Sequence, residues 1–155
     1  MPLEKMLSAN RIQCGAECTS KKRALEALAE LIASSVPTLK AEELFQQLIN
    51  RERLGSTGIG DGIAIPHCRF ATGGASICAV MTLKTPIDFD AVDGKPVDII
   101  FAMLVPENAD NEHLQNLAAL AEALQASNFA EKLRSADSNS ALFNTAVAPF
   151  AEQAR

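Results

Sequence analysis

Apolar residues recur every three or four positions in two stretches near the start of the chain, which is the pattern of an amphipathic helix. The first stretch contains Leu25, Leu28, Leu31 and Ile32. Thr19 or Ser20 is suited to cap its N-terminus, and residues 34–37 end it. The second stretch contains Ala41, Leu44, Phe45, Leu48 and Ile49. We expect Thr38 to cap this second helix, which closes near residues 50–53.

The middle of the chain is richer in strand signals. Residues 12–17 are compatible with a short strand, and residues 77–83 and 97–105 are predicted as longer ones. Residues 93–96, with the sequence Asp-Gly-Lys-Pro, form a turn signal between the last two. Residues 97–105 are apolar nearly throughout, so we expect this strand to be central and covered on both faces.

Helical spacing returns towards the end of the chain. Asp110 is suited to cap a helix whose apolar face contains Leu114, Leu117, Ala118, Ala121 and Leu124. A short helix is expected from residues 127–128, and a last one over about residues 138–150. Helices in blocks at both ends of a strand-rich middle predict an α/β (α+β-like) fold, a mixed β-sheet flanked by helices. The absence of repeats and linkers predicts one domain over residues 1–155.

Composition narrows the function classes. Apolar residues make up 48% of the chain, enough for a sizeable core, and the formal net charge is −5. This mildly acidic balance argues against nucleic-acid binding, which needs a basic footprint. Neither a signal peptide nor a membrane-length apolar segment is evident, so we expect a cytoplasmic protein without a membrane span. The four cysteines are then expected to be free thiols.

Residues 55–62 form a glycine-rich segment with four glycines in eight residues. It lacks the Gly-Lys-Ser/Thr ending of a Walker A loop, and it does not join a strand to a helix as a dinucleotide fingerprint does. Its backbone amides remain suited to cradle an anion. The segment leads into an apolar run, residues 63–65, which Pro66 stops and holds extended.

Three side chains carry candidate chemistry. His67 follows Pro66, at a place that exposes a side chain on a fixed backbone, although a lone histidine there is also compatible with an ordinary turn residue. His113 falls at position N3 if Asp110 is the N-cap, where the electropositive helix end suits an anion, and it is equally compatible with a packed residue of the first turn. Arg51 either complements a helix C-terminus or grips phosphoryl oxygens bidentately.

The stretch Arg-Glu-Arg-Leu-Gly-Ser-Thr-Gly-Ile-Gly-Asp-Gly-Ile-Ala-Ile-Pro-His-Cys, residues 51–68, closely resembles the signature of the type-2 enzyme IIA domains. These belong to the bacterial phosphoenolpyruvate-dependent phosphotransferase system and are also called the mannitol/fructose class. The sequence Gly-Ser-Thr-Gly-Ile-Gly leans towards the nitrogen-regulatory branch. Residues 85–97 and the helix that begins near His113 extend the resemblance to about residues 5–150.

The resemblance implies a single-domain type-2 enzyme IIA fold and a set of roles. His67 would be the phosphorylated histidine, His113 the second active-site histidine, and Arg51 the arginine that contacts the phosphoryl group. No cofactor and no metal are implied, because the donor is itself a phosphohistidine. Cys68 replaces a glycine often found after the histidine, and we expect a thiol there to add a risk of oxidation.

The resemblance favours a phosphocarrier of the nitrogen-related phosphotransferase system. It would accept a phosphoryl group on His67 from an HPr-like protein fed by an enzyme I homologue, and regulate target proteins by its phosphorylation state. The alternative is a fructose- or mannitol-type transport component that passes the group to a IIB protein. The chain ends soon after the IIA-like region, which favours the regulatory reading. A binding module without chemistry, and a metal site of His67, Cys68 and His113, are weaker alternatives.

Overall fold

The computed structural model describes residues 3–126 and 128–153, and their centre is a six-stranded mixed β-sheet. The strand order is β1-β5-β6-β3-β2, and β4 also pairs with β6. Their bounds are β1 Leu7–Ala16, β2 Gly58–Gly60, β3 Ile63–Ala64, β4 His67–Phe70, β5 Ile77–Ile87 and β6 Val97–Pro106. β1 runs parallel to β5, and both β3 and β4 run parallel to β6, whereas the β5–β6 and β2–β3 pairs are antiparallel. The mixed sheet expected from the sequence is confirmed.

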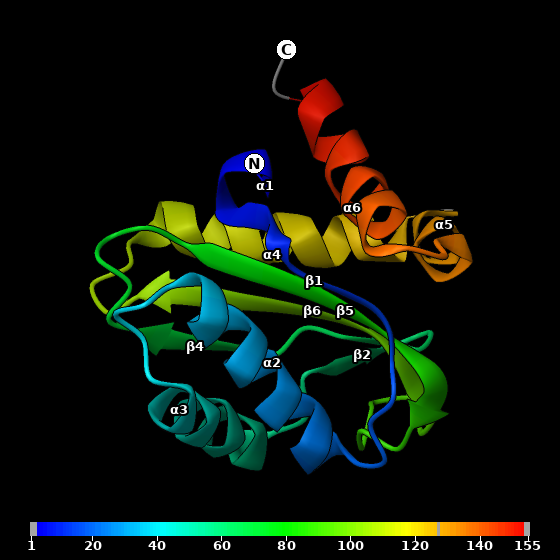
Figure 1. The fold of residues 1–155 in the computed structure, drawn as a ribbon, viewed down its shortest axis with the longest axis horizontal. Coiled ribbons are helices and arrows are strands. Elements are labelled where there is room, and N and C mark those ends of the chain that lie inside the picture. Colours follow the sequence, from blue (N-terminus) through cyan, green and yellow to red (C-terminus); the bar gives the residue numbers. More distant parts are fainter. Residues whose placement is uncertain (1–2, 127, 154–155) are drawn as a thin grey trace.

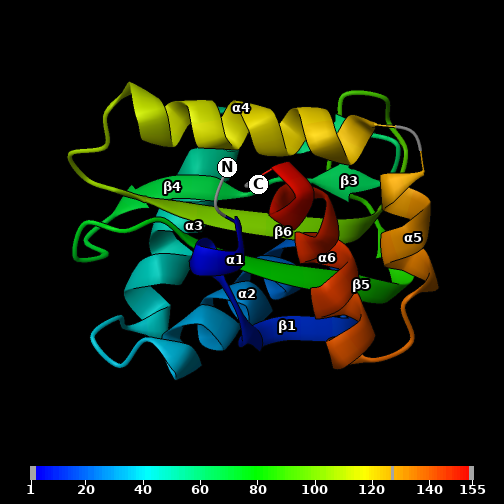
Figure 2. The ribbon, with the colours of Figure 1, turned by 90° about the horizontal axis from the view of Figure 1, so that it is seen from above.

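Helices cover both faces of this sheet (Figure 1). Their bounds are α1 Leu3–Met6, α2 Lys21–Ser35, α3 Ala41–Leu54, α4 Asn111–Gln125, α5 Phe129–Ser135 and α6 Asn139–Gln153. α2 and α3 pack on one face, and α1, α4, α5 and α6 lie on the other (Figures 1 and 2). The result is three layers, with the sheet in the middle.

β6 is the central strand, as the sequence predicted, and its side chains alternate between two cores. Ile100 and Leu104 pack with α2 and α3, whereas Phe101 and Met103 pack with the helices of the other face. Every one of these four side chains is 0% exposed. Since each face of β6 is covered, its near-continuous apolar sequence is what this position requires.

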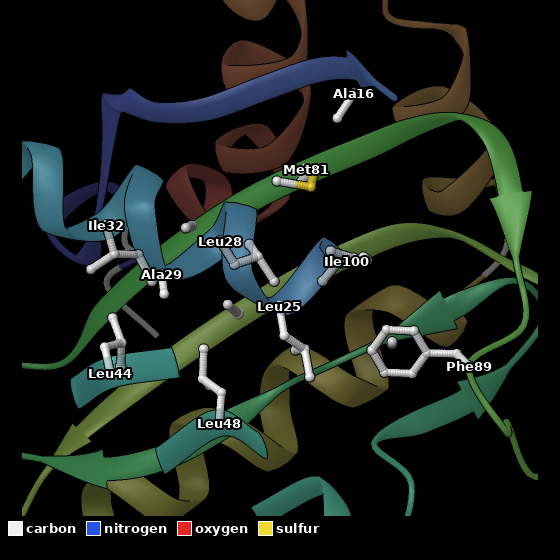
Figure 3. Close-up of a cluster of buried hydrophobic side chains, with 14 of the residues drawn as sticks. Ala16, Leu25, Leu28, Ala29, Ile32, Leu44, Leu48, Met81, Phe89 and Ile100 are labelled. Atoms are coloured by element: carbon white, nitrogen blue, oxygen red, sulfur yellow. The ribbon is translucent and has the colours of Figure 1, made fainter. Parts of the chain in front are cut away.

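The core under α2 and α3 shows why the first two amphipathic patterns fold as helices. Leu25 and Leu28 of α2, Leu44 and Leu48 of α3 and the sheet residue Ile100 belong to one cluster of buried side chains between the helices and the sheet (Figure 3). The helical spacing of these leucines places them on one side of each helix. Burying each side chain contributes roughly 1.5–3 kcal/mol of transfer free energy.

Two of the predicted helix starts are confirmed and one is wrong. Ser20 caps α2, accepting a hydrogen bond of 3.2 Å from the backbone N–H of Arg23, and Asp110 caps α4. Thr38 does not cap α3, because the N-cap is Lys40, whose side chain makes no capping bond. A turn carries the chain past Thr38, closed by the N–H of Leu39 and the carbonyl of Val36 at 2.9 Å.

Other boundaries also differ from the sequence prediction, and the strand expected over residues 77–83 continues to Ile87. The strand expected over residues 12–17 begins at Leu7 and ends at Ala16, because its pairing with β5 extends back to Cys78. The glycine-rich segment is not wholly a loop, since residues 58–60 form β2 against β3. The predicted start of a helix at residue 127 falls outside the described residues, and α5 follows directly after Asn128.

None of the helices in the described ranges has the length and apolar character of a membrane span.

Candidate functional site

β3 and β4 lie one after the other along β6, with Pro66 near the break between them. The carbonyl of Pro66 accepts a hydrogen bond of 2.9 Å from the N–H of Met103, so the break is itself tied to the central strand. β2 pairs with β3 and, among the described strands, β4 pairs with β6 alone. His67, the first residue of β4, therefore lies beside an open edge of the sheet on a fixed backbone.

His67 and Cys68 point to opposite faces of the sheet. His67 is paired with Met103, which belongs to the core under α4, whereas Cys68 belongs to the core under α2 and α3. Burial raises the pKa of the Cys68 thiol to about 12, which lowers the oxidation risk expected from the sequence. Within the described residues, no three or more His, Cys, Asp or Glu side chains gather as metal ligands, so a shared site of His67, Cys68 and His113 has no support.

The ring of His67 is held by a backbone carbonyl. Its Nδ1 lies 2.8 Å from the carbonyl oxygen of Ile65. A carbonyl oxygen only accepts hydrogen bonds, so Nδ1 carries the hydrogen and Nε2 keeps its lone pair. This geometry leaves Nε2 as the nucleophilic atom.

The surroundings of His67 favour its neutral form. Burial lowers the pKa of His67 below the ordinary histidine value, and the positive charge of Arg51 acts in the same direction. The hydrogen bond to Ile65 and the charge of Glu52 oppose this shift in part. The imidazole is therefore uncharged near pH 7, as a nucleophile must be.

Arg51 comes to the same place from α3. It lies in the last turn of that helix, and its Nη1 donates a hydrogen bond of 2.9 Å to the carbonyl of Gly55. Arg51 and His67 line one open pocket of about 520 Å³. Leu114 and Leu117 of α4 form the opposite wall, so the pocket lies at the sheet edge between α3 and α4. The sequence predicted this pairing, and the structure brings the two side chains together.

His113 lies in the first turn of α4 but is not among the residues that line this pocket. Asp110 Oδ1 accepts from the N–H groups of Glu112 and His113 at 3.1 and 3.5 Å, which confirms the predicted N3 position. The Nδ1 of His113 is 2.8 Å from the hydroxyl oxygen of Ser76. Both histidines are in the described part of the chain, and no hydrogen bond joins their rings. His113 is adjacent to the pocket, because the next residue of α4, Leu114, is part of its lining.

A buried charged network behind Arg51 was not expected from the sequence. Glu52 is 8% exposed and accepts from the backbone N–H of Thr57 at 2.9 Å and from the Thr57 hydroxyl at 2.7 Å. Lys21 of α2 completes the network, with its Nζ 2.9 Å from Glu52. The network fixes the segment that leaves α3, and with it Gly55, the partner of Arg51. No local pattern announces it, since glutamate within a helix is usually exposed.

Arg69 is a second residue whose part the sequence did not reveal. Its Nη1 donates to the carbonyl oxygens of Glu107 and Ala109, at 3.2 and 3.3 Å. These residues immediately precede the cap of α4 at Asp110. Arg69 thus ties β4 to the start of the helix that carries His113.

Taken together, the pocket contains a neutral imidazole with a free Nε2 lone pair and a permanent cation, and a second imidazole lies outside its lining at the N-terminus of α4. A lone pair facing dispersed positive charge suits the capture of a phosphoryl group, whose charge is spread over its equatorial oxygens. The family model described as "Phosphoenolpyruvate-dependent sugar phosphotransferase system, EIIA 2" matches residues 5–146. The chain belongs to this family.

Relatives of this EIIA 2 chain include nitrogen regulatory proteins and a sugar-specific component. A nitrogen regulatory protein of Pseudomonas aeruginosa is 46% identical over 145 residues, which cover 94% of each chain. The crystal structure of the nitrogen regulatory protein IIA-Ntr of Neisseria meningitidis superimposes with a TM-score of 0.86 at 37% identity, over 94% of this chain and 99% of that one. A fructose-specific EIIABC component of Bacillus subtilis is 27% identical over 144 residues, 93% of this chain and 23% of that protein. The type-2 enzyme IIA fold expected from the sequence is confirmed.

Proposed function

We propose that this chain is a histidine phosphocarrier of the nitrogen-related phosphotransferase system and that His67 Nε2 accepts the phosphoryl group. The observation that carries the proposal is the geometry of His67, whose Nδ1 is engaged by the Ile65 carbonyl while its ring shares a pocket with Arg51. The donor in this proposal is an HPr-like protein that itself carries a phosphohistidine. The identity with nitrogen regulatory proteins supports the branch of the system.

The transfer is a displacement at phosphorus. The Nε2 lone pair of His67 forms the new N–P bond while the N–P bond of the donor breaks and its electron pair returns to the donor imidazole. The Ile65 carbonyl keeps the Nδ1 hydrogen and stabilises the positive charge that develops on the His67 ring. Arg51 binds the equatorial oxygens, and His113 donates a further hydrogen bond to them. No metal is required, because the leaving group is an imidazole.

The rim of the pocket suits a protein donor. Leu54, at the end of α3, is 84% exposed, and Leu114, at the start of α4, is 44% exposed. These two leucines stand on either side of the opening that contains His67. Exposed apolar side chains around a polar centre are typical of a surface that another protein covers. A carrier that exchanges phosphoryl groups with proteins in this way would act in the cytoplasm.

Incubation with enzyme I, the HPr-like protein and radiolabelled phosphoenolpyruvate tests the site. The proposal expects one acid-labile phosphoryl group on the unchanged chain and none on His67→Ala. His113→Ala removes the other histidine and leaves the acceptor, so this chain should still be labelled, although more slowly because a hydrogen bond to the phosphoryl oxygens is lost. Persistent labelling of the His67→Ala chain would show that the acceptor is another residue.

The second candidate function is sugar transport, favoured by the likeness to the fructose-specific component. The same chemistry serves both, so the acceptor of the next step decides between them. The regulatory proposal expects proteins captured from an extract to differ between the phosphorylated and unphosphorylated forms. Rapid dephosphorylation by a purified fructose- or mannitol-type IIB protein, with no such difference, would favour the transport function.

A further inference from the structure

Ser76 is a buried polar residue for which the mechanism above has no use. It precedes β5 directly and is 6% exposed. Its neighbour Ile77 belongs to the core under α2 and α3, and Cys78 belongs to the core under α4. By alternation Ser76 faces α4, on the same side of the sheet as His67. Its hydroxyl there meets Nδ1 of His113 at 2.8 Å.

The hydrogen in this bond is assigned by counting donors and acceptors. A hydroxyl has one hydrogen, and neutral imidazole has one N–H and one lone pair. Among the described residues, the Ser76 hydroxyl has no hydrogen-bond partner other than His113. If Nδ1–H donated to Ser76, the hydroxyl hydrogen would be buried without an acceptor, which costs roughly 1–3 kcal/mol. The arrangement that satisfies both groups has Ser76 donating to the Nδ1 lone pair.

We propose that Ser76 is a positioning residue that holds His113 in the tautomer with its hydrogen on Nε2. The inference rests on the proposed function, because it gives His113 the N–H that a phosphoryl oxygen needs. The ring is then fixed in two ways, by the Asp110 cap on its backbone and by the Ser76 hydroxyl on its inner nitrogen. Fixing the inner nitrogen of a histidine through a second residue is a general way of setting which outer atom acts.

The two histidines are thereby set in opposite states by opposite partners. His67 meets a carbonyl, which only accepts, and therefore exposes a lone pair on Nε2. His113 meets a hydroxyl that donates, and therefore exposes an N–H on Nε2. One ring is prepared to attack phosphorus and the other to bind its oxygen.

Nitrogen-15 NMR of the unphosphorylated protein, labelled at histidine, tests the assignment. The chain has two histidines, so His67→Gln and His113→Gln assign the signals. We expect His113 as the Nε2–H tautomer in the unchanged chain and in Ser76→Thr, which keeps the hydroxyl. In Ser76→Ala we expect averaging between the two tautomers. A His113 that is Nδ1–H in the unchanged chain, or whose tautomer is the same in Ser76→Ala, overturns the proposal.

The rate of phosphoryl transfer gives a second, independent readout. We expect Ser76→Ala to lower the maximal rate about tenfold with little change in the donor concentration at half-maximal rate, since a transition-state contact is lost. The same substitution in a His113→Gln chain should cost nothing further. Thr72→Ala is the matched control. The Thr72 hydroxyl lies in the same segment between β4 and β5, donates to the Ala75 carbonyl and does not contact His113.

The outcomes separate this inference from the proposed function. Equal rate losses from Ser76→Ala with and without His113, or from Thr72→Ala, would mean that Ser76 acts only by shaping its segment, and would overturn the inference. In that case, the absence of labelling on the His67→Ala chain would still support His67 as the phosphoryl acceptor. Conversely, a failure to label His67 in the unchanged chain would remove the proposed function, while the NMR measurement would still decide whether Ser76 sets the tautomer.

Discussion

Replacing Glu52 by glutamine tests whether the buried network behind Arg51 supports both the fold and the site. The carboxylate side chain is 5% exposed, and Lys21 Nζ lies 2.9 Å from it. At that separation and an effective dielectric constant near 20, the gross attraction is about 6 kcal/mol. Desolvation of both groups offsets a large share, and removing one partner of a buried pair typically costs 3–5 kcal/mol. Glutamine keeps the shape and one acceptor for Thr57, so we expect a loss of about 3 kcal/mol.

Urea unfolding measures this loss, provided that the slope of the free energy against urea concentration is unchanged. The melting temperature should fall by about 10 °C. Glu43→Gln, an exposed change on the same helix, should cost under about 1 kcal/mol. A double-mutant cycle with Lys21→Met isolates the pair, with an expected coupling of about 2 kcal/mol. The network also fixes the segment that contains Gly55, whose carbonyl accepts a hydrogen bond from Arg51. The rate of phosphoryl acceptance should therefore fall as well. A coupling below about 0.5 kcal/mol would refute the reasoning.

Three further changes follow from the geometry. Because burial lowers the pKa of His67, an NMR titration of its ring should have a midpoint below the ordinary value of about 6.5. As pH falls, the unfolded chain binds the proton before the folded chain does. The free energy of unfolding should therefore decrease as pH falls from about 6.5 towards the pKa of His67 in the folded chain. A midpoint at or above 6.5 would contradict this. Gly58→Ala would place a methyl carbon 2.7 Å from Cβ of Ala91, so we expect urea unfolding to show a loss of about 1–3 kcal/mol that Ala91→Gly relieves in part; an unchanged midpoint would show that the segment yields. In a variant that keeps only Cys68, the native thiol should react with a disulfide reagent at pH 8 on the order of 10³-fold more slowly than free cysteine, and rapid labelling before unfolding would count against its burial.

The sequence was most informative where the determinant of a structure is local. Ser20 and Asp110 cap the helices that follow them by bonds that span two or three residues, so a short window contains both partners. The predicted start of α3 was wrong because no local side-chain bond marks it. Lys40 begins that helix without a side-chain bond, and Thr38 offered a capping side chain that the chain does not use.

The candidate site divides along the same line. Arg51 and His67 stand in one continuous motif, and the structure places them in one pocket. Ser76 and His113 are 37 residues apart, and their contact exists only because α4 returns over the start of β5. Neither residue carries a local pattern that announces the other. The separate roles proposed for the two histidines therefore could not be inferred without the fold.

The pocket beside His67 has one wall from each of the two outer layers of the molecule. α3 belongs to the layer on one face of the sheet and α4 to the layer on the other, and the open edge of β4 lies between them. Figure 2 shows α4 running beside β4 and β3, along that part of the sheet. A small sliding of either helix against the sheet therefore changes the width of the opening, even if no bond within β4 changes. A protein bound across that opening, as proposed for the phosphoryl donor, would contact both layers at once.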